Sequence, residues 1–355
     1  MEERWRHLAE ILVTYSAAVQ PGERVMIAMS ELETYPLAQE VYAAVVRAGG
    51  LPQVQFLSES LRHALLRYGN PDQLAWEPAI EAYGMEWADV YFGLRGAYDP
   101  HIHDDIAAEA LARNQATQGR ISTLRWQKTR WCLVRVPNDA LAQQAGMTRA
   151  DVEAMFFAAS LLDWPAVAAE WHRVAEVLGR GRTIRIVGAE TDLQFEVAGR
   201  RWVTLDGRIN MPDGEIMTAP IVPTIQGQIL FEQPAVFGGR VIEQIRLRWR
   251  DGQLIEAHAA TNEEYLQAIV QTDAGAGTIG EFAFGVNPHL THFTHDILLD
   301  EKIGGTIHLA LGRAYPECGG TNVSAIHWDI VKDLRGGGTV YLDGVPVQCD
   351  GVLLL

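Results

Sequence analysis

Hydrophobic positions in the first half of the chain switch repeatedly between a helical period and short apolar runs. The apolar runs that predict buried strands are Arg24–Met29, Gln53–Leu57, Asp89–Leu94 and Trp131–Val136. The helical periods cover residues 4–19, 35–48, 59–68, 71–85 and 104–118. Strands that alternate with helices in this way form a parallel sheet with helices on both faces. The pattern therefore predicts an α/β fold for this part of the chain.

The pattern changes in the second half. Two further helical periods, residues 151–162 and 164–178, are followed by a strand-rich region over residues 183–260. A hairpin turn is predicted at residues 250–253, and one clear helix at residues 262–272. We therefore predict an N-terminal α/β domain with a parallel sheet over residues 1–180, and a C-terminal mixed α+β domain over residues 181–355.

Composition narrows the classes of protein. The 355 residues are 48 % hydrophobic and 21 % charged, which is enough apolar material for two folded domains. The net charge of −16 argues against nucleic acid as a partner, because phosphate binding needs clustered Lys and Arg. It argues equally against docking to an anionic membrane surface.

Cysteine usage and the N-terminus bear on localisation. Cys132, Cys318 and Cys349 match no disulfide framework or metal knuckle, which favours a reducing, cytoplasmic setting. The first residues, MEERWRHLAEIL, lack the basic start and apolar run of a secretory signal. No apolar stretch approaches the roughly 20 residues that span a bilayer.

Acids and histidines gather in short, glycine-rich blocks of the second half. His327 and Asp329 alternate along a predicted strand, so both side chains point to one face. His308 lies on another short strand, while Glu281 and Glu215 each follow a glycine turn. Two imidazoles and three carboxylates suit two divalent cations that share a water. Each residue alone also fits a structural or surface role, so the pattern leaves both interpretations open.

Other motifs carry less weight. Residues 275–280 read GAGTIG, but a helix precedes them and a strand follows, which is the reverse of a dinucleotide-binding site. His101 and His103 fit a solvated loop in which Asp104 or Asp105 caps the next helix. The roles of these two histidines, and of His289, His292 and His295 near the expected site, stay open. The G-x-S-x-G, H-E-x-x-H and C-x-x-C motifs are absent from the sequence.

Four blocks together resemble the aminopeptidase T/aminopeptidase S family of dinuclear metallo-aminopeptidases. They are DGEIMTAP, GEFAFGVNP, DEKIGGTIHLALGRAYPECGG and NVSAIHWDIV. The resemblance implies an enzyme with metal ligands Glu215, Glu281, His308, His327 and Asp329, and with Tyr315 beside the metals. It also implies a homodimer in which residues 181–355 form the metal-binding catalytic domain. The segment from Tyr315 to His327 is shorter than in some members, which bears on access to the site.

The resemblance further implies hydrolysis of the N-terminal residue of peptides that have a free amino group. Two divalent ions, Zn, Co, Mn or Mg, would activate a bridging water or hydroxide, with Glu281 and Tyr315 as catalytic residues. The alternative is a mononuclear iron ring-cleaving dioxygenase of the dihydroxypyridine type, which shares the fold. That chemistry needs only two histidines and one carboxylate. The additional acids and His308 therefore favour the peptidase.

Overall fold

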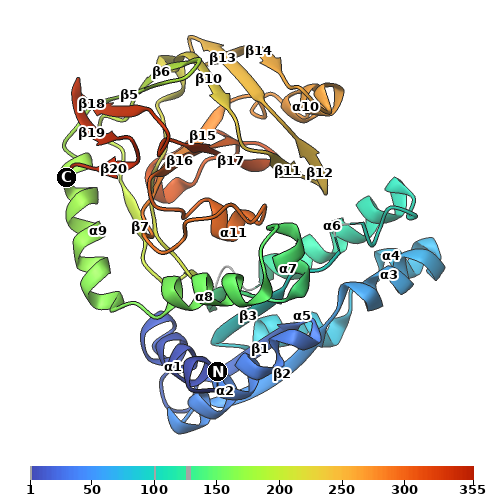
Figure 1. Cartoon of the computed structure of the whole chain (residues 1–355). Coiled ribbons are helices and arrows are strands. Elements are labelled where there is room, and N and C mark those ends of the chain that lie inside the picture. The colour runs from blue at the N-terminus through green and yellow to red at the C-terminus, as the bar shows by residue number, and fades with distance from the viewer. Residues whose placement is uncertain (1, 100, 125–128) are drawn as a thin grey trace. The chain divides into compact units, whose positions relative to one another are not determined.

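The computed structural model describes residues 2–99, 101–124 and 129–355, which form two compact units (Figure 1). The first unit comprises Met1–Leu162 and Gly207–Pro212, and the second comprises Asp163–Asp206 and Asp213–Leu355. The sequence places the boundary at residue 180, whereas helix α9 (Trp164–Leu178) belongs to the second unit. The physical reason is that α9 packs on strand β7 (Val203–Leu205) of that unit.

A parallel sheet forms the centre of the first unit, with strand order β2-β1-β3-β4-β8. The strands are β1 (Arg24–Ser30), β2 (Leu51–Leu57), β3 (Val90–Gly96), β4 (Arg130–Val136) and β8 (Asn210–Met211). The α-helices are α1 (Glu2–Ile11), α2 (Tyr35–Arg47), α3 (Glu59–Tyr68), α4 (Pro71–Ala75), α5 (Ala79–Trp87), α6 (Ala108–Leu124), α7 (Asp139–Gln144) and α8 (Arg149–Ser160). A π-helical turn, Leu12–Ser16, extends α1, and a 3-10 turn, Leu32–Thr34, precedes α2. The predicted α/β fold is confirmed.

Two local predictions in this unit are wrong. The single helix predicted over residues 71–85 is two helices, α4 and α5, because Pro78 has no N–H for a continuous helix. The helix predicted from residue 104 begins at Ala108, after a run of turns. Below the sheet, Met26 and Ala28 of β1 pack against Met85 of α5 and Ile121 of α6.

Antiparallel sheets build the second unit. Eight strands have the order β14-β13-β10-β6-β5-β18-β19-β20, five have the order β17-β16-β15-β9-β7, and β11 pairs with β12. The strands of the eight-stranded sheet are β5 (Thr183–Gly188), β6 (Thr191–Glu196), β10 (Gln226–Phe231), β13 (Ile245–Arg250), β14 (Gln253–His258), β18 (Thr339–Leu342), β19 (Val345–Cys349) and β20 (Val352–Leu353). The five-stranded sheet adds β9 (Glu215–Thr218), β15 (Ile279–Gly285), β16 (Thr306–Gly312) and β17 (His327–Asp333) to β7.

The remaining elements of this unit are short. They are the hairpin strands β11 (Ala235–Phe237) and β12 (Arg240–Ile242), the helices α10 (Glu263–Val270) and α11 (Ile297–Asp300), and the 3-10 turns Val222–Thr224 and Pro316–Cys318. The predicted hairpin at residues 250–253 joins β13 to β14, and α10 lies inside the predicted range 262–272. The mixed α+β character predicted for this part is confirmed.

The two large sheets of the second unit pack face to face. Phe282 of β15 meets Phe195 of β6 with ring centroids 5.3 Å apart, and Phe284 and Trp202 extend this aromatic core. Figure 1 shows β15, β16 and β17 below the eight-stranded sheet, with α11 on their other side. Because side chains alternate along a strand, the residues next to Phe282 point away from this core, toward the side of α11.

Among the described residues, no single helix has both the length and the apolar composition to cross a membrane. The consecutive helices α8 and α9 have the required length and apolar composition only when the two are counted together.

Candidate metal centre

The five predicted ligands lie on one face of the five-stranded sheet. In the register of β15, β16 and β17, Ala310 pairs with both Glu281 and Asp329, and Gly312 pairs with His327. Paired residues share a face, and so do alternate residues of one strand, which adds His308 to this face. Strand β9 brings Glu215 opposite Gly285 of β15, again in phase with Glu281. The sequence pattern showed the alternation within β17, whereas the register joins four strands.

Glu281 lies between the two histidines. Its Oε1 is 3.4 Å from His308 Nε2, and its Oε2 is 3.5 Å from His327 Nε2. Glu215 Oε1 lies 3.3 Å from His308 Nε2, and Asp329 Oδ1 lies 3.4 Å from His327 Nε2. The donors thus form two groups, one around each imidazole, and Glu281 offers one oxygen to each.

These distances fit metal coordination better than direct hydrogen bonding. N–H···O bonds to a carboxylate are typically about 2.7–2.9 Å long. Two ligands of one tetrahedral ion, each about 2.0–2.2 Å from it, are about 3.3–3.6 Å apart. The four separations given above are 3.3–3.5 Å, and Asp329 Oδ1 lies farther from His308 Nε2, at 3.9 Å. The residues present therefore suit a divalent ion in each group.

Atoms without partners support the same interpretation. Glu281 Oε2 is buried and has no hydrogen-bond partner. His327 Nδ1 lies 2.7 Å from the backbone carbonyl of Arg313, so this nitrogen carries the proton and donates it. Nε2 of His327 faces Glu281 and Asp329, and presents them with a lone pair once it has given up its proton. An imidazole fixed by a carbonyl in this way is the usual form of a metal-ligating histidine.

The electrostatics of the site call for positive charge among its acids. Burial, together with the charges of Glu215 and Asp329, raises the pKa of Glu281 to about 8. Burial opposes a charged imidazole, yet the nearby carboxylates raise the pKa of His327 to about 9 and that of His308 well above its ordinary value. Carboxylates this close and this buried are stable only with protons or cations between them.

Tyr315 lies beside the second group, as the resemblance implied. Its ring meets that of His327 edge to face, with centroids 4.8 Å apart. Burial and then the surrounding carboxylates raise the pKa of the Tyr315 hydroxyl, so this group keeps its proton and can donate it. The chain folds back after Tyr315 through hydrogen bonds from the amides of Cys318 and Gly320 to the Tyr315 carbonyl. This short turn holds the ring against the site.

Sequence reasoning missed two charged residues of the site. Glu301 groups with Glu215 and His308 within 4.8 Å, and the ammonium of Lys302 hydrogen-bonds Glu301 and lies 3.8 Å from Glu215 Oε2. Burial raises the pKa of Glu301 to about 7. Both follow α11, outside the strand pattern that drew attention to the other ligands. The available signal was a charged triplet, Asp300-Glu301-Lys302, between two apolar runs.

Glycines allow the ligand strands to approach closely. Gly214, with φ of 139°, precedes Glu215, and a Cβ there would lie 2.8 Å from the side chain of Asn287. Gly280 precedes Glu281, and a Cβ there would lie 2.4 Å from the carbonyl of Gly312. Residues 275–280, GAGTIG, connect α10 to β15 and lead directly to Glu281, and their last two residues already belong to β15.

An apolar wall adjoins the metal ligands on the same sheet face. It consists of the buried residues Met217, Ala219, Ala283 and Cys318, with the partly buried Val203, Leu205 and Tyr315 packed against them. Met217 and Ala283 pair across β9 and β15, each two residues from a carboxylate ligand. The charges of Glu281 and Glu215 add to burial in raising the pKa of the Cys318 thiol to about 12. The site thus combines a charged centre with an apolar flank.

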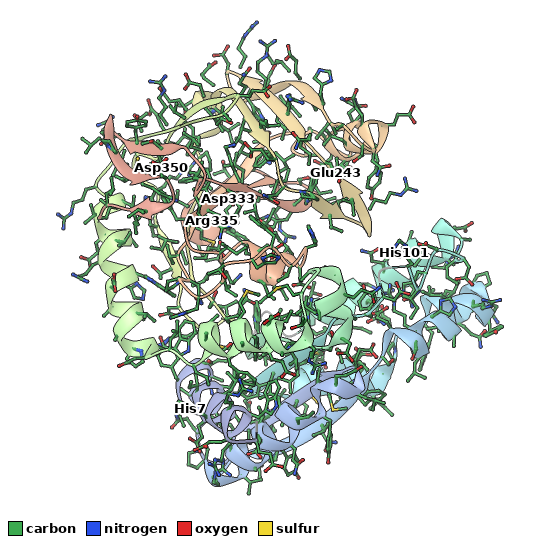
Figure 2. The ribbon with its side chains drawn as sticks, in the orientation of Figure 1. His7, His101, Glu243, Asp333, Arg335 and Asp350 are labelled. Atoms are coloured by element: carbon green, nitrogen blue, oxygen red, sulfur yellow. The ribbon has the colours of Figure 1, made fainter. Side chains whose placement is uncertain are left out.

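The other predicted histidines belong to neither group among the described residues. His101, labelled in Figure 2, pairs with Asp104 at 3.0 Å in the segment before α6. His103 Nε2 is 2.9 Å from Glu59 Oε2. The proposed capping role of Asp104 or Asp105 is wrong, since α6 begins at Ala108 and Asp105 bonds Arg67 instead.

The three histidines of the 289–295 loop also lie outside both groups. The amide of His289 donates to Asn287, and the amide of His295 donates to Asp300. His292 is exposed. The contacts of His289 and His295 shape the loop before α11, and α11 leads directly to Glu301.

Comparison with known families agrees with the geometry. A sequence model of the thermophilic metalloprotease (M29) family matches residues 1–338, so the chain belongs to that family. Aminopeptidase 2 of Geobacillus stearothermophilus is 24 % identical over an alignment 391 positions long, which covers 95 % of this chain and 92 % of the relative. Aminopeptidase T of Thermus thermophilus is 26 % identical over 87 % of this chain and 84 % of its own length. The family resemblance drawn from the motifs is confirmed.

Solved structures show the same fold. Wild-type AmpT from Thermus thermophilus superposes with a TM-score of 0.88 at 23 % identity over 99 % of both chains. The 2,5-dihydroxypyridine dioxygenase from Pseudomonas putida KT2440 superposes with a TM-score of 0.61 at 15 % identity, over 100 % of this chain and 98 % of that one. The second likeness extends to the fold alone, and the family assignment does not favour the dioxygenase alternative.

Proposed function

We propose that this chain is a metal-dependent aminopeptidase that removes the N-terminal residue of peptides with a free amino group. The observation that carries the proposal is the shared position of Glu281, whose two oxygens face two different histidines at 3.4 and 3.5 Å. A mononuclear site of two histidines and one carboxylate would use Glu281, His308 and His327, but it would leave Glu215 and Asp329, which lie 3.3 and 3.4 Å from the two imidazoles, without a role. The family of the chain and the names of its relatives support the same activity.

The donor set assigns residues to two ions. Glu215, Glu281 and His308 would hold one, and Glu281, His327 and Asp329 would hold the other, with Zn, Co, Mn and Mg all compatible with such ligands. When bound, ions of this kind polarise a carbonyl and lower the pKa of water from about 15.7 to near 7. The ions' number and identity are part of this proposal.

The protein's own groups supply orientation and charge. The backbone carbonyl of Arg313 keeps His327 in the tautomer that presents Nε2. Tyr315 keeps its proton and, from its place against His327, would donate a hydrogen bond to the oxyanion that forms at the scissile carbonyl. The excess of carboxylates favours a substrate with a positive N-terminus, whereas the apolar wall around Met217 favours an apolar first side chain.

The cellular location and the oligomeric state are also part of this proposal. A cytoplasmic location is supported by the cysteines, because Cys132, Cys318 and Cys349 form no disulfide in the described structure. A homodimer is expected from the family resemblance, and light scattering on a sizing column measures it directly.

Metal analysis and substrate assays test the function. The purified protein should contain two divalent ions per chain and hydrolyse aminoacyl-arylamides, but not the same compounds with an acetylated amino group. Oxygen uptake with a dihydroxypyridine is the parallel assay for the dioxygenase alternative. Equal cleavage of free and acetylated substrates, or oxygen uptake without arylamide hydrolysis, contradicts the proposal.

A further inference from the structure

Lys302 is a fully buried ammonium at the edge of the first ligand group. Its side chain is 0 % exposed, it hydrogen-bonds Glu301, and its Nζ lies 3.8 Å from Glu215 Oε2. An ammonium removed from water is costly unless charges of opposite sign surround it. Lys302 is therefore held in place by the same carboxylates that would face an ion.

The two carboxylates next to Lys302, Glu215 and Glu301, both belong to the His308 group. Glu215, Glu301 and His308 offer donor atoms that all lie within 4.8 Å of one another. The ammonium of Lys302 thus lies close to both of these acids, and His308 Nε2 lies 3.3 Å from Glu215 Oε1. Glu281, His327 and Asp329 form the other group, where the charge of Lys302 contributes to the lowered pKa of Asp329 after the larger effects of His327 and His308.

The charges of the site indicate what the contact of Lys302 with the two acids does. The site holds four carboxylates, Glu215, Glu281, Glu301 and Asp329, for a total of −4 when all are ionised. Two divalent ions supply +4. Lys302 adds +1, which also faces the charge of the buried Asp213. In a buried site, positive charge at this position favours the negative charge that develops at a carbonyl oxygen during hydrolysis.

We propose that Lys302 is a positioning residue of the metal centre, which orients Glu215 and Glu301 toward the ion of the His308 group. This inference rests on the proposed function for the existence of that ion. It predicts a larger effect on the ion of the His308 group, because Lys302 contacts Glu215 and Glu301 directly and acts on Asp329 through its charge. It also predicts that the effect depends on Glu301.

Another lysine of the same sheet provides a matched control. Lys332 is 1 % exposed, and its Nζ contacts Glu232 Oε1 at 2.9 Å and the carbonyl of Leu230 at 2.8 Å. It pairs in register with Ile307, so it points to the face opposite His308. Lys332→Met therefore removes a buried, glutamate-paired ammonium of the same kind without touching the ligands.

The test measures metal affinity on the metal-free full-length protein. Zn²⁺ is titrated in competition with a chromophoric chelator, and thermal unfolding is recorded for each variant. Lys302→Met should weaken one of the two ions by about 10- to 100-fold and leave the other within about threefold, the usual effect of losing a residue that orients a ligand. Lys332→Met should leave both Zn²⁺ affinities within about threefold of those of the unaltered protein, even if its unfolding temperature falls by as much as that of Lys302→Met.

A double variant checks the dependence on Glu301. Glu301→Gln with Lys302→Met removes a negative and a positive charge together, and its loss of affinity should be smaller than the sum of the two single losses. Unchanged Zn²⁺ affinity in Lys302→Met, an equal loss in Lys332→Met, or strict additivity in the double variant overturns the proposal. Because no substrate is present, these results stand apart from any failure of aminopeptidase activity.

Discussion

Glu281→Gln changes the one residue that both ligand groups share. The amide has nearly the same shape as the carboxylate, so the packing of β15 is unaffected, but it carries no charge and one of its two ends is an NH₂ donor. Each ion then loses a ligand or meets a neutral one. Loss of a group that only orients a ligand weakens metal binding by about 10- to 100-fold. Loss of a shared ligand should therefore exceed about 100-fold for each ion, or about 2.7 kcal/mol.

Activity should fall by at least about 1000-fold, or about 4 kcal/mol of transition-state stabilisation, because both ions are affected. The assay pairs arylamide hydrolysis with metal content, with circular dichroism to confirm folding. Glu153→Gln is the control, since Glu153 is also buried and accepts a 2.7 Å bond from Arg149, but belongs to the first unit. A Glu281→Gln protein that keeps two ions and more than a tenth of its activity would refute the bridging role.

Three further predictions concern other parts of the molecule. Tyr315→Phe removes only the hydroxyl, so kcat should fall by about 100- to 1000-fold with KM and metal content nearly unchanged; a large change in KM alone would contradict oxyanion stabilisation. Phe282→Ala empties a fully buried ring site and should cost about 3–5 kcal/mol in urea unfolding of the second unit, and a loss below 1 kcal/mol would contradict the packing. The hydrogen-bonded Arg24 guanidinium holds the pKa of Asp89 at about 2, so its stabilisation is present above about pH 4 and is lost as the pH falls toward 2. Asp89→Asn should cost up to about 1 kcal/mol at pH 7, since this pair is partly exposed, and the difference from wild type should vanish in acid; a constant difference would exclude the ion pair as its cause.

The sequence was sufficient for elements whose signals are local. Four strands of the parallel sheet, β1 to β4, and helix α9 follow from apolar periods, whereas the two-residue strand β8 is too short to show one. The break between α4 and α5 was also readable at Pro78, but a continuous helical period masked it. The short helix α7 went unpredicted, because six residues give too few turns for a period to show.

The residues of the site likewise divide into those that a local pattern predicts and those that it does not. His327 and Asp329 could be assigned to one face because alternation within a strand is local. The proximity of Glu215 to His308 depends on the order β17-β16-β15-β9-β7, which joins segments far apart in the chain. The spacing of the ligands along the chain does not give this order, and the resemblance implied the ligand set without it. Glu301 and Lys302 lie outside the strands, so neither alternation nor the motif pattern pointed to them.

The same strands explain why ligand substitutions should spare the fold. On β15 and β17 the residues next to the ligands, Phe282 and Trp328, are buried, and their rings pack against Phe195 of β6 and Phe237 of β11. These side chains fix the position of each strand, and the ligands occupy the alternate positions on the opposite face. Burial on one face therefore determines ligand geometry on the other. It follows that Glu281→Gln should alter metal binding with little change in unfolding of the metal-free protein, whereas Phe282→Ala should weaken folding and, through displaced strands, metal binding together.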